Sequence, residues 1–181
     1  MIKQCFESKL PTDAQAHAEN LLPGAEIEFY LENDKQALNY ANLAENHYIS
    51  LGEKQKKSVG WFGVRLKKIR AALEVEAGAY QSALSLYKEG LTILDSTNET
   101  AQNSGGELYR LKADLLSGIA FVQLKTGLYS EAISNLESAL AELSDSALDN
   151  YPRGGILNDF GHLLNEQRSH RQLIPFRALN L

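Results

Sequence analysis

Apolar residues recur along this chain with the spacing of amphipathic helices. Two stripes of this kind are Phe62, Leu66, Ile69 and Leu73, and Leu108, Leu111, Leu115 and Ile119. Residues three or four positions apart lie on one face of an α-helix, so each stripe predicts a helix with one buried face. No stretch alternates apolar and polar residues with a period of two, as a half-buried strand would. The pattern therefore predicts an all-α protein.

One pattern is repeated along the chain. The segments GAYQSALSLYKEGL and GLYSEAISNLESAL begin at residues 78 and 127, and in both an Ala follows the Tyr by three positions. Pairs of Ala twelve residues apart accompany these copies and also occur earlier: Ala25 and Ala37, Ala71 and Ala83, Ala120 and Ala132. A more divergent fourth copy aligns Gly161 with the first Ala and Leu173 with the second. Such internal periodicity predicts one supersecondary unit used about four times.

The repeat resembles the tetratricopeptide repeat, in which a helix pair carries small residues where its helices approach most closely. The Gly-x-Tyr turns at Gly78 and Gly127 match the family, as do the late small residues Ala44, Gly90 and Ala139. The resemblance implies a right-handed α-solenoid of about four antiparallel helical hairpins, forming one domain over residues 1–181. The expected repeats are 18–50, 54–95, 106–145 and 153–181.

These units are longer than the family's usual period of about 34 residues. We attribute the excess to long first helices, at about 54–77 and 106–126, and to the polar loop DSTNETAQNSGG at 95–106. The Trp and Pro of the usual repeat are absent at the matching places, so the subfamily is open.

Length and composition indicate how many domains the protein has and in which compartment it is expected. A length of 181 residues suits one domain with a substantial core. One cysteine, Cys5, excludes an internal disulfide, and the first twenty residues contain no apolar run of signal-peptide length. No later segment approaches a membrane span. We therefore expect a cytoplasmic protein with no membrane association.

Charge is unevenly distributed along the chain. The formal net charge is −5, yet the segment 53–70 carries seven bases and one acid. On a helix its bases form two lines on either side of the apolar stripe: Lys54, Lys57, Arg65 and Lys68, and Lys56, Lys67 and Arg70. Two solvated flanks of a core face are the simplest interpretation, and an exposed Trp61 would favour a binding surface instead. An acidic protein with one such segment is not expected to be a general nucleic-acid binder.

In tetratricopeptide arrays the first helix of each pair lines the concave surface. Carrying those positions over implies these partner-binding residues: Phe29, Tyr30, Arg65, Lys68, Phe121, Asn158 and His162. The same positions also hold Leu22, Glu26, Ala72, Val75, Asp114, Ser117, Leu124 and Asn165. Aromatic anchors with nearby polar groups suit a peptide, and Arg65 and Lys68 are expected to recognise an acidic group on it. The Lys and Asn residues with which chaperone-binding members hold a C-terminal carboxylate are missing.

Catalytic and metal-binding patterns are weak. Asp159, His162, Glu166 and His170 have a spacing that could bind zinc on one helix face. The repeat pattern argues against this site because it places a turn near residues 167–169. Ser, His and Asp residues lack an activating context, and the Gly-rich stretches lack the Lys and Ser/Thr of a phosphate loop. We expect no catalytic residue, metal or cofactor.

The sequence thus predicts a non-catalytic scaffold or adaptor that binds a protein or peptide on its concave face. The alternative is a regulatory or nucleic-acid-associated protein that uses the basic segment 53–70, and a third possibility is an enzyme with an unrecognised site. The fourth copy ends at Leu181 without a capping helix, and its apolar residues predict self-association through this end.

Overall fold

A computed structural model describes residues 14–51, 60–97, 107–143 and 154–158, together with Gly161 and Asn165. All regular secondary structure within these ranges is helical, which confirms the all-α prediction. The six long helices are α2 (Ala14–Tyr30), α3 (Asp34–Ser50), α5 (Gly60–Glu76), α6 (Tyr80–Thr97), α7 (Glu107–Lys125) and α8 (Tyr129–Glu142). In this part of the chain no helix combines the length and apolarity needed to cross a membrane.

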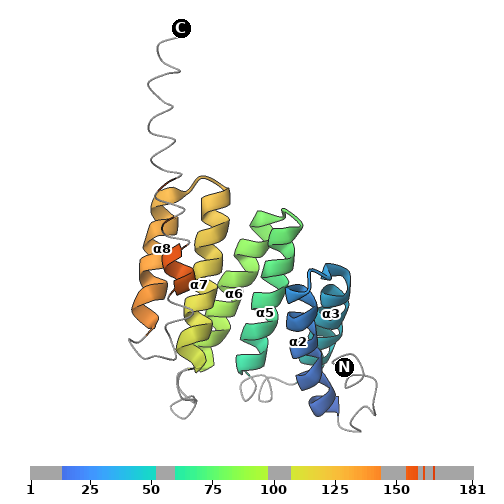
Figure 1. Cartoon of the computed structure of the whole chain (residues 1–181). Helices are drawn as coiled ribbons and strands as arrows, with labels where there is room; N and C mark the ends of the chain where they lie inside the picture. Colours follow the sequence, from blue (N-terminus) through green and yellow to red (C-terminus); the bar gives the residue numbers. More distant parts are fainter. Residues whose placement is uncertain are drawn as a thin grey trace, which may run out of the picture.

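The helices pack as three successive antiparallel hairpins, α2 with α3, α5 with α6 and α7 with α8 (Figure 1). Each first helix also contacts the first helix of the next hairpin, α2 with α5 and α5 with α7. Each second helix contacts the following first helix, α3 with α5 and α6 with α7. The helix α5 therefore contacts four other helices. The hairpins lie close to the predicted repeats at 18–50, 54–95 and 106–145.

The turns inside the hairpins share one backbone geometry. Gly78 and Gly127 have φ of 74° and 79°, in the left-handed region that glycine tolerates best. The residue after each glycine donates its N–H to a carbonyl five residues back, Ala79 to Glu74 and Leu128 to Gln123, both at 2.8 Å. This bond closes the C-terminus of the first helix.

The first hairpin has the same turn without a glycine. Glu32 has φ of 57°, and the following Asn33 donates its N–H to the Glu28 carbonyl at 2.9 Å. Glu32 precedes Ala37 by five residues, as Gly78 precedes Ala83. The turn is therefore in the same register in all three hairpins, although only two of them carry the glycine.

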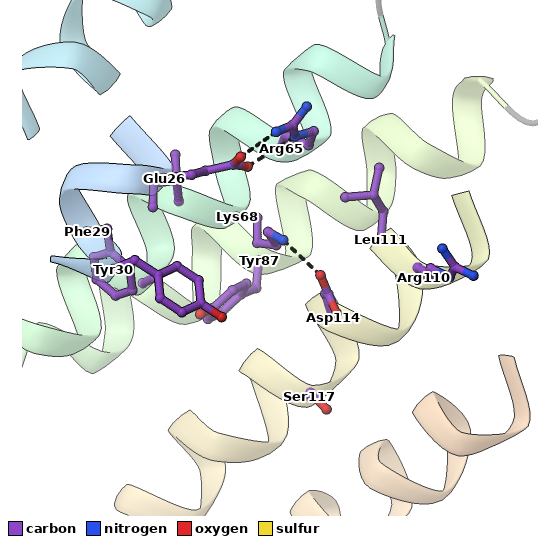
Figure 2. A pocket seen from close by; sticks show the side chains of 12 residues that line it. Glu26, Phe29, Tyr30, Arg65, Lys68, Tyr87, Arg110, Leu111, Asp114 and Ser117 are labelled. Atoms are coloured by element: carbon purple, nitrogen blue, oxygen red, sulfur yellow. Dashed lines mark hydrogen bonds and ion pairs between the residues drawn. The ribbon is translucent and has the colours of Figure 1, made fainter. Parts of the chain in front are cut away.

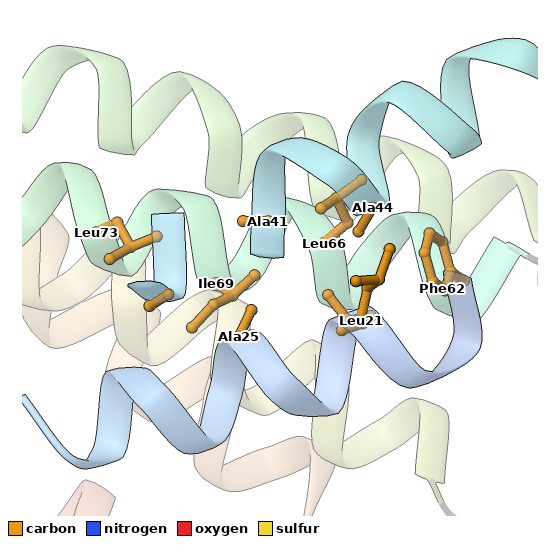
Figure 3. Packing of buried hydrophobic residues seen from close by; sticks show 10 residues of the cluster. Leu21, Ala25, Ala41, Ala44, Phe62, Leu66, Ile69 and Leu73 are labelled. Atoms are coloured by element: carbon orange, nitrogen blue, oxygen red, sulfur yellow. The ribbon is translucent and has the colours of Figure 1, made fainter. Parts of the chain in front are cut away.

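Small residues allow the paired helices to approach closely. The six alanines that define the repeat, at 25, 37, 71, 83, 120 and 132, are all buried. Figure 3 shows the first core cluster, in which Ala25 of α2 and Ala41 of α3 face Leu66 and Ile69 of α5. Two further clusters continue the core through α5, α6, α7 and α8. The apolar stripe on α5 is buried along its length, as predicted.

Tyrosines packed on glycines join successive hairpins. A Cβ added to Gly63 of α5 would lie 2.7 Å from Cζ of Tyr48, which comes from α3. A Cβ added to Gly118 of α7 would lie 2.8 Å from the hydroxyl oxygen of Tyr87, which comes from α6. Both distances are too short for a real carbon, so each glycine provides room for a ring from the preceding hairpin.

The structure corrects two details of the sequence analysis. Leu22, expected on the concave surface, is fully buried in the first core cluster. Gly161, aligned with the buried small position of the fourth copy, is exposed, and no atom of its described surroundings lies within 4 Å of an added Cβ. Ile156, five residues earlier, is buried in the third cluster against α7 and α8. The predicted self-associating end at 170–181 lies outside the described residues.

Candidate functional site

A groove of about 570 Å³ crosses the first helices of the three hairpins (Figure 2). It is lined by Glu26, Phe29 and Tyr30 of α2, by Arg65, Lys68, Ile69 and Ala72 of α5, by Tyr87 of α6, and by Arg110, Leu111, Asp114 and Ser117 of α7. On each first helix these residues recur every three or four positions, so they form one continuous face. Residues on the other side of each helix recur with the same spacing and face the core.

Two ion pairs lie across the groove. The Arg65 guanidinium holds the Glu26 carboxylate with two nitrogens, and its Nε donates to Oε1 at 3.0 Å. Lys68 Nζ donates to Asp114 Oδ2 at 2.8 Å. The pairs join α5 to α2 on one side and to α7 on the other. Arg65 and Lys68, which were expected to recognise an acidic group on a partner, are therefore already paired with carboxylates of the groove itself.

Three aromatic rings line the groove, Phe29 and Tyr30 from α2 and Tyr87 from α6. Tyr30 is 83% exposed, whereas Phe29 is partly buried and packs against the first core cluster. Tyr87 is only 6% exposed. Burial, with a smaller contribution from the negative charge of Asp114, raises the pKa of Tyr87 to about 12. The phenol is therefore neutral at physiological pH, and it supplies an apolar ring with a polar edge.

The groove unites four of the seven predicted binding residues: Phe29, Tyr30, Arg65 and Lys68. Phe121 lies farther along α7, outside the groove lining, and its ring is 5.1 Å from the Lys125 ammonium. Asn158 is exposed in the short helical segment at 154–158 and does not line the groove either. His162 lies outside the described residues. Phe121 and Asn158 therefore lie outside this groove, and their role in binding a partner stays a prediction.

Four lining residues were not among the predicted groove positions: Ile69, Tyr87, Arg110 and Leu111. Tyr87 is the one that no first-helix position could have supplied. It belongs to a second helix, to which the tetratricopeptide resemblance assigns no groove position. Its ring reaches the groove because Gly118 leaves space for it on α7. A glycine inside an otherwise strongly helical segment was the one available signal, since such a residue often marks a close approach.

The other flank of the basic segment is also neutralised. Arg70 donates to the Glu45 carboxylate, and Lys67 Nζ lies 2.9 Å from Glu89 Oε2 and 3.7 Å from Glu45 Oε1. The hydrogen bond from Lys67 is the main cause that lowers the pKa of Glu89. All four bases of α5 are thus paired with acids of neighbouring helices. Lys54, Lys56 and Lys57 lie outside the described residues.

Trp61 is 38% exposed at the start of α5. The Arg65 guanidinium carbon lies 5.8 Å from the centroid of its ring, within the range of a cation–π contact. This contact steadies the Arg65 side chain, while the Trp61 ring also packs edge-on against Phe62 and keeps part of its surface open to solvent.

Metal-ligating residues do not cluster in the described ranges: no group of three or more His, Cys, Asp or Glu residues there could hold a metal ion. All four residues of the zinc candidate, Asp159, His162, Glu166 and His170, lie outside the described residues.

Comparison with known proteins assigns no family. No family model matches the chain, and no solved structure matches it. A curated protein of Agrobacterium fabrum (strain C58 / ATCC 33970), named single-strand DNA-binding protein, is 27% identical over 185 aligned positions. The alignment covers 99% of this chain and 30% of that protein, so the chain spans less than a third of the length of this relative.

Proposed function

We propose that this protein is a non-catalytic module that binds a protein or peptide in the groove across α2, α5 and α7. We further propose that its hairpins form a right-handed solenoid of the tetratricopeptide type. The shared turn register and the recurring contacts between successive hairpins support the solenoid. The groove supports the binding role, because exposed aromatic side chains next to ordered polar groups are typical of interaction surfaces.

The observation that carries this proposal is the position of Tyr30. A tyrosine that is 83% exposed at the mouth of a groove contributes little to its own fold, yet it offers a large, rigid contact area to a partner. Phe29 beside it is held in place by the core. Because these rings and Tyr87 line the same groove, a partner side chain bound there would contact aromatic surface in place of water.

The test is peptide binding by a matched pair of variants. Peptides are selected from a random displayed library on the full chain, and affinities are measured for the wild type, Tyr30→Ala and Tyr109→Ala. Tyr109 is 61% exposed on α7 and does not line the groove. Loss of a hot-spot aromatic costs about 2 kcal/mol, so Tyr30→Ala should weaken binding by roughly thirtyfold. Tyr109→Ala should leave it within twofold. Equal affinities of the two variants would contradict a groove site.

A second candidate function is association with nucleic acid. The relative named single-strand DNA-binding protein is the observation that favours it. The pairing of Arg65, Lys67, Lys68 and Arg70 with carboxylates argues against it. Bases strengthen binding by neutralising phosphates and releasing the counterions condensed on the nucleic acid, and bases already neutralised by fixed acids contribute little to this.

Fluorescence anisotropy with a labelled oligo-dT strand at two salt concentrations separates the two functions. If the groove is the functional surface, the oligonucleotide should not bind with a salt-dependent affinity. The nucleic-acid role would instead be supported by micromolar binding that weakens steeply with salt. This binding should be lost in a variant that combines Lys54→Gln, Lys56→Gln and Lys57→Gln.

A further inference from the structure

We infer that the groove selects a peptide segment that is uncharged where it crosses α5 and that presents an aromatic or large aliphatic side chain to Tyr30 and Tyr87. This inference rests on the proposed peptide-binding function and specifies its partner. It follows from the two ion pairs and from the position of the three rings.

The ion pairs disfavour a charged occupant of either sign. A partner carboxylate that approached Lys68 would also approach Asp114, whose Oδ2 lies 2.8 Å from the Lys68 nitrogen. A partner ammonium that approached Glu26 would meet the Arg65 guanidinium in the same way. In both cases one ion pair is exchanged for another, while the incoming charge loses its hydration and meets a like charge nearby.

An uncharged polar group avoids this conflict. The Lys68 bond engages Oδ2 of Asp114, and a carboxylate has acceptor sites on both oxygens. A side-chain amide or a backbone peptide group can donate to such a carboxylate and accept from a guanidinium or ammonium without displacing either partner. Asn, Gln or exposed peptide backbone therefore suits the stretch between the two pairs.

The rings define where the apolar anchor lies. Phe29, Tyr30 and Tyr87 all line the groove. Figure 2 shows Phe29 and Tyr30 on its α2 side and Tyr87 toward the Lys68–Asp114 pair. Tyr87 is buried and Phe29 is held by the core, so the site is largely formed before a partner arrives. Preformed apolar sites gain affinity by excluding water from the side chain that enters them.

The experiment begins with the random library selected on the full chain, with Tyr30→Ala as the counter-selection. Enriched sequences should combine an aromatic or large aliphatic residue with neighbouring Gln or Asn and should have a net charge near zero in this stretch. Synthetic peptides then carry Gln, Glu or Lys at the central position. We expect the Glu and Lys peptides to bind at least tenfold more weakly than the Gln peptide.

A charge variant of the protein provides the decisive comparison. Asp114→Asn removes the carboxylate from Lys68 and should improve the Glu peptide about tenfold while changing the Gln peptide less than threefold. Circular dichroism confirms that the variant is folded; if it is not, Glu26→Gln makes the equivalent change at Arg65. Enrichment of acidic sequences, or an unchanged ranking of the three peptides in the charge variant, would overturn the inference. Failure to enrich any Tyr30-dependent peptide would instead overturn the proposed function.

Discussion

At the scale of single residues, the turn of each hairpin depends on one left-handed backbone position. Gly78 and Gly127 occupy it without strain, whereas Glu32 occupies it with a side chain that this conformation disfavours. Around Gly78 no atom lies within 4 Å of an added Cβ, so only backbone conformation distinguishes the residues that fit there.

Introducing a glycine at the left-handed position, or removing one from it, should therefore change stability in opposite directions. Glu32→Gly should raise the free energy of unfolding by roughly 0.5–1 kcal/mol, and Gly78→Ala should lower it by about 1 kcal/mol. Urea denaturation followed by circular dichroism measures both. If both variants were destabilised, residues other than the left-handed position would control the first turn.

Gly118 and Tyr87 form a close contact between hairpins. In Gly118→Ala the new methyl group would overlap the Tyr87 ring. Overpacking costs about 1–3 kcal/mol, which should outweigh the gain of about 1 kcal/mol in helix propensity. We expect a net loss of about 1 kcal/mol in thermal or urea denaturation.

Two controls isolate the contact at Gly118. Gly155 is exposed in a helical segment, with nothing within 4 Å of an added Cβ, so Gly155→Ala should be neutral or mildly stabilising. In a Tyr87→Leu background, Gly118→Ala should lower the free energy of unfolding by less than it does in the wild type. If Gly118→Ala lowered the free energy of unfolding equally in both backgrounds, the Tyr87 ring would not be the obstacle.

Ionisation of Tyr87 links stability to alkaline pH. Its pKa is about 12 in the folded protein, against 10.0 for the ordinary side chain. Below pH 10 both states hold the proton. Above pH 10 the unfolded chain releases it first, so stability falls as pH rises toward 12. Two pH units correspond to about 2–3 kcal/mol.

Tyr87→Phe should lose less stability than the wild type between pH 10 and 12. The readout is urea denaturation at several pH values, and Tyr109→Phe is the control because Tyr109 is 61% exposed. Parallel pH profiles of wild type and Tyr87→Phe would contradict the assigned role of burial.

At the scale of helices, close approach within a hairpin depends on alanine. Ala132 of α8 is fully buried and belongs to the third core cluster with Ala113 and Ala120 of α7. Because protein cores are packed at high density, a larger side chain must displace a neighbouring helix.

Ala132→Leu should therefore lower the free energy of unfolding by about 1–3 kcal/mol, and Ala83→Leu in α6 should behave alike. Ala141→Leu is the control, because Ala141 is exposed on the same helix α8. Thermal denaturation gives the comparison. A similar loss at positions 132 and 141 would show that helix contact does not limit side-chain size at the repeat alanines.

At the scale of the whole molecule, the helices differ in how many other helices they pack against. The helix α5 packs against α2, α3, α6 and α7, and its four bases pair with acids on all four of these neighbours. Opening α5 therefore requires the loss of contacts with all three hairpins. Regions whose opening disrupts the most structure exchange their amide hydrogens most slowly.

Native-state hydrogen exchange should find the slowest amides in α5 and faster exchange in α3 and α8. The difference arises because those two helices each contact fewer neighbours among the described elements. Mass spectrometry of exchanged peptides measures it. Uniform protection across the three hairpins would mean that the molecule opens only as one unit.

Periodicity alone was sufficient to predict the helices and their buried faces. The stripe from Phe62 to Leu73 and the repeat alanines are buried because a residue's face on a helix follows from its position in the chain. The turns at Gly78 and Gly127 were also predictable, since a left-handed residue there favours glycine. The equivalent turn at Glu32 was not, because its sequence lacks that signal.

The groove required the tertiary structure. The sequence determined that Phe29, Tyr30, Arg65 and Lys68 would share helix faces, but their chemical state depends on what lies opposite. Glu26 and Asp114 come from helices far away in the chain, and their distance from the two bases follows from how α2 and α7 pack on α5. Tyr87 entered the groove because a glycine on a neighbouring helix left room for its ring. Local pattern therefore decided which residues face outward, whereas packing between hairpins decided which charges are already paired.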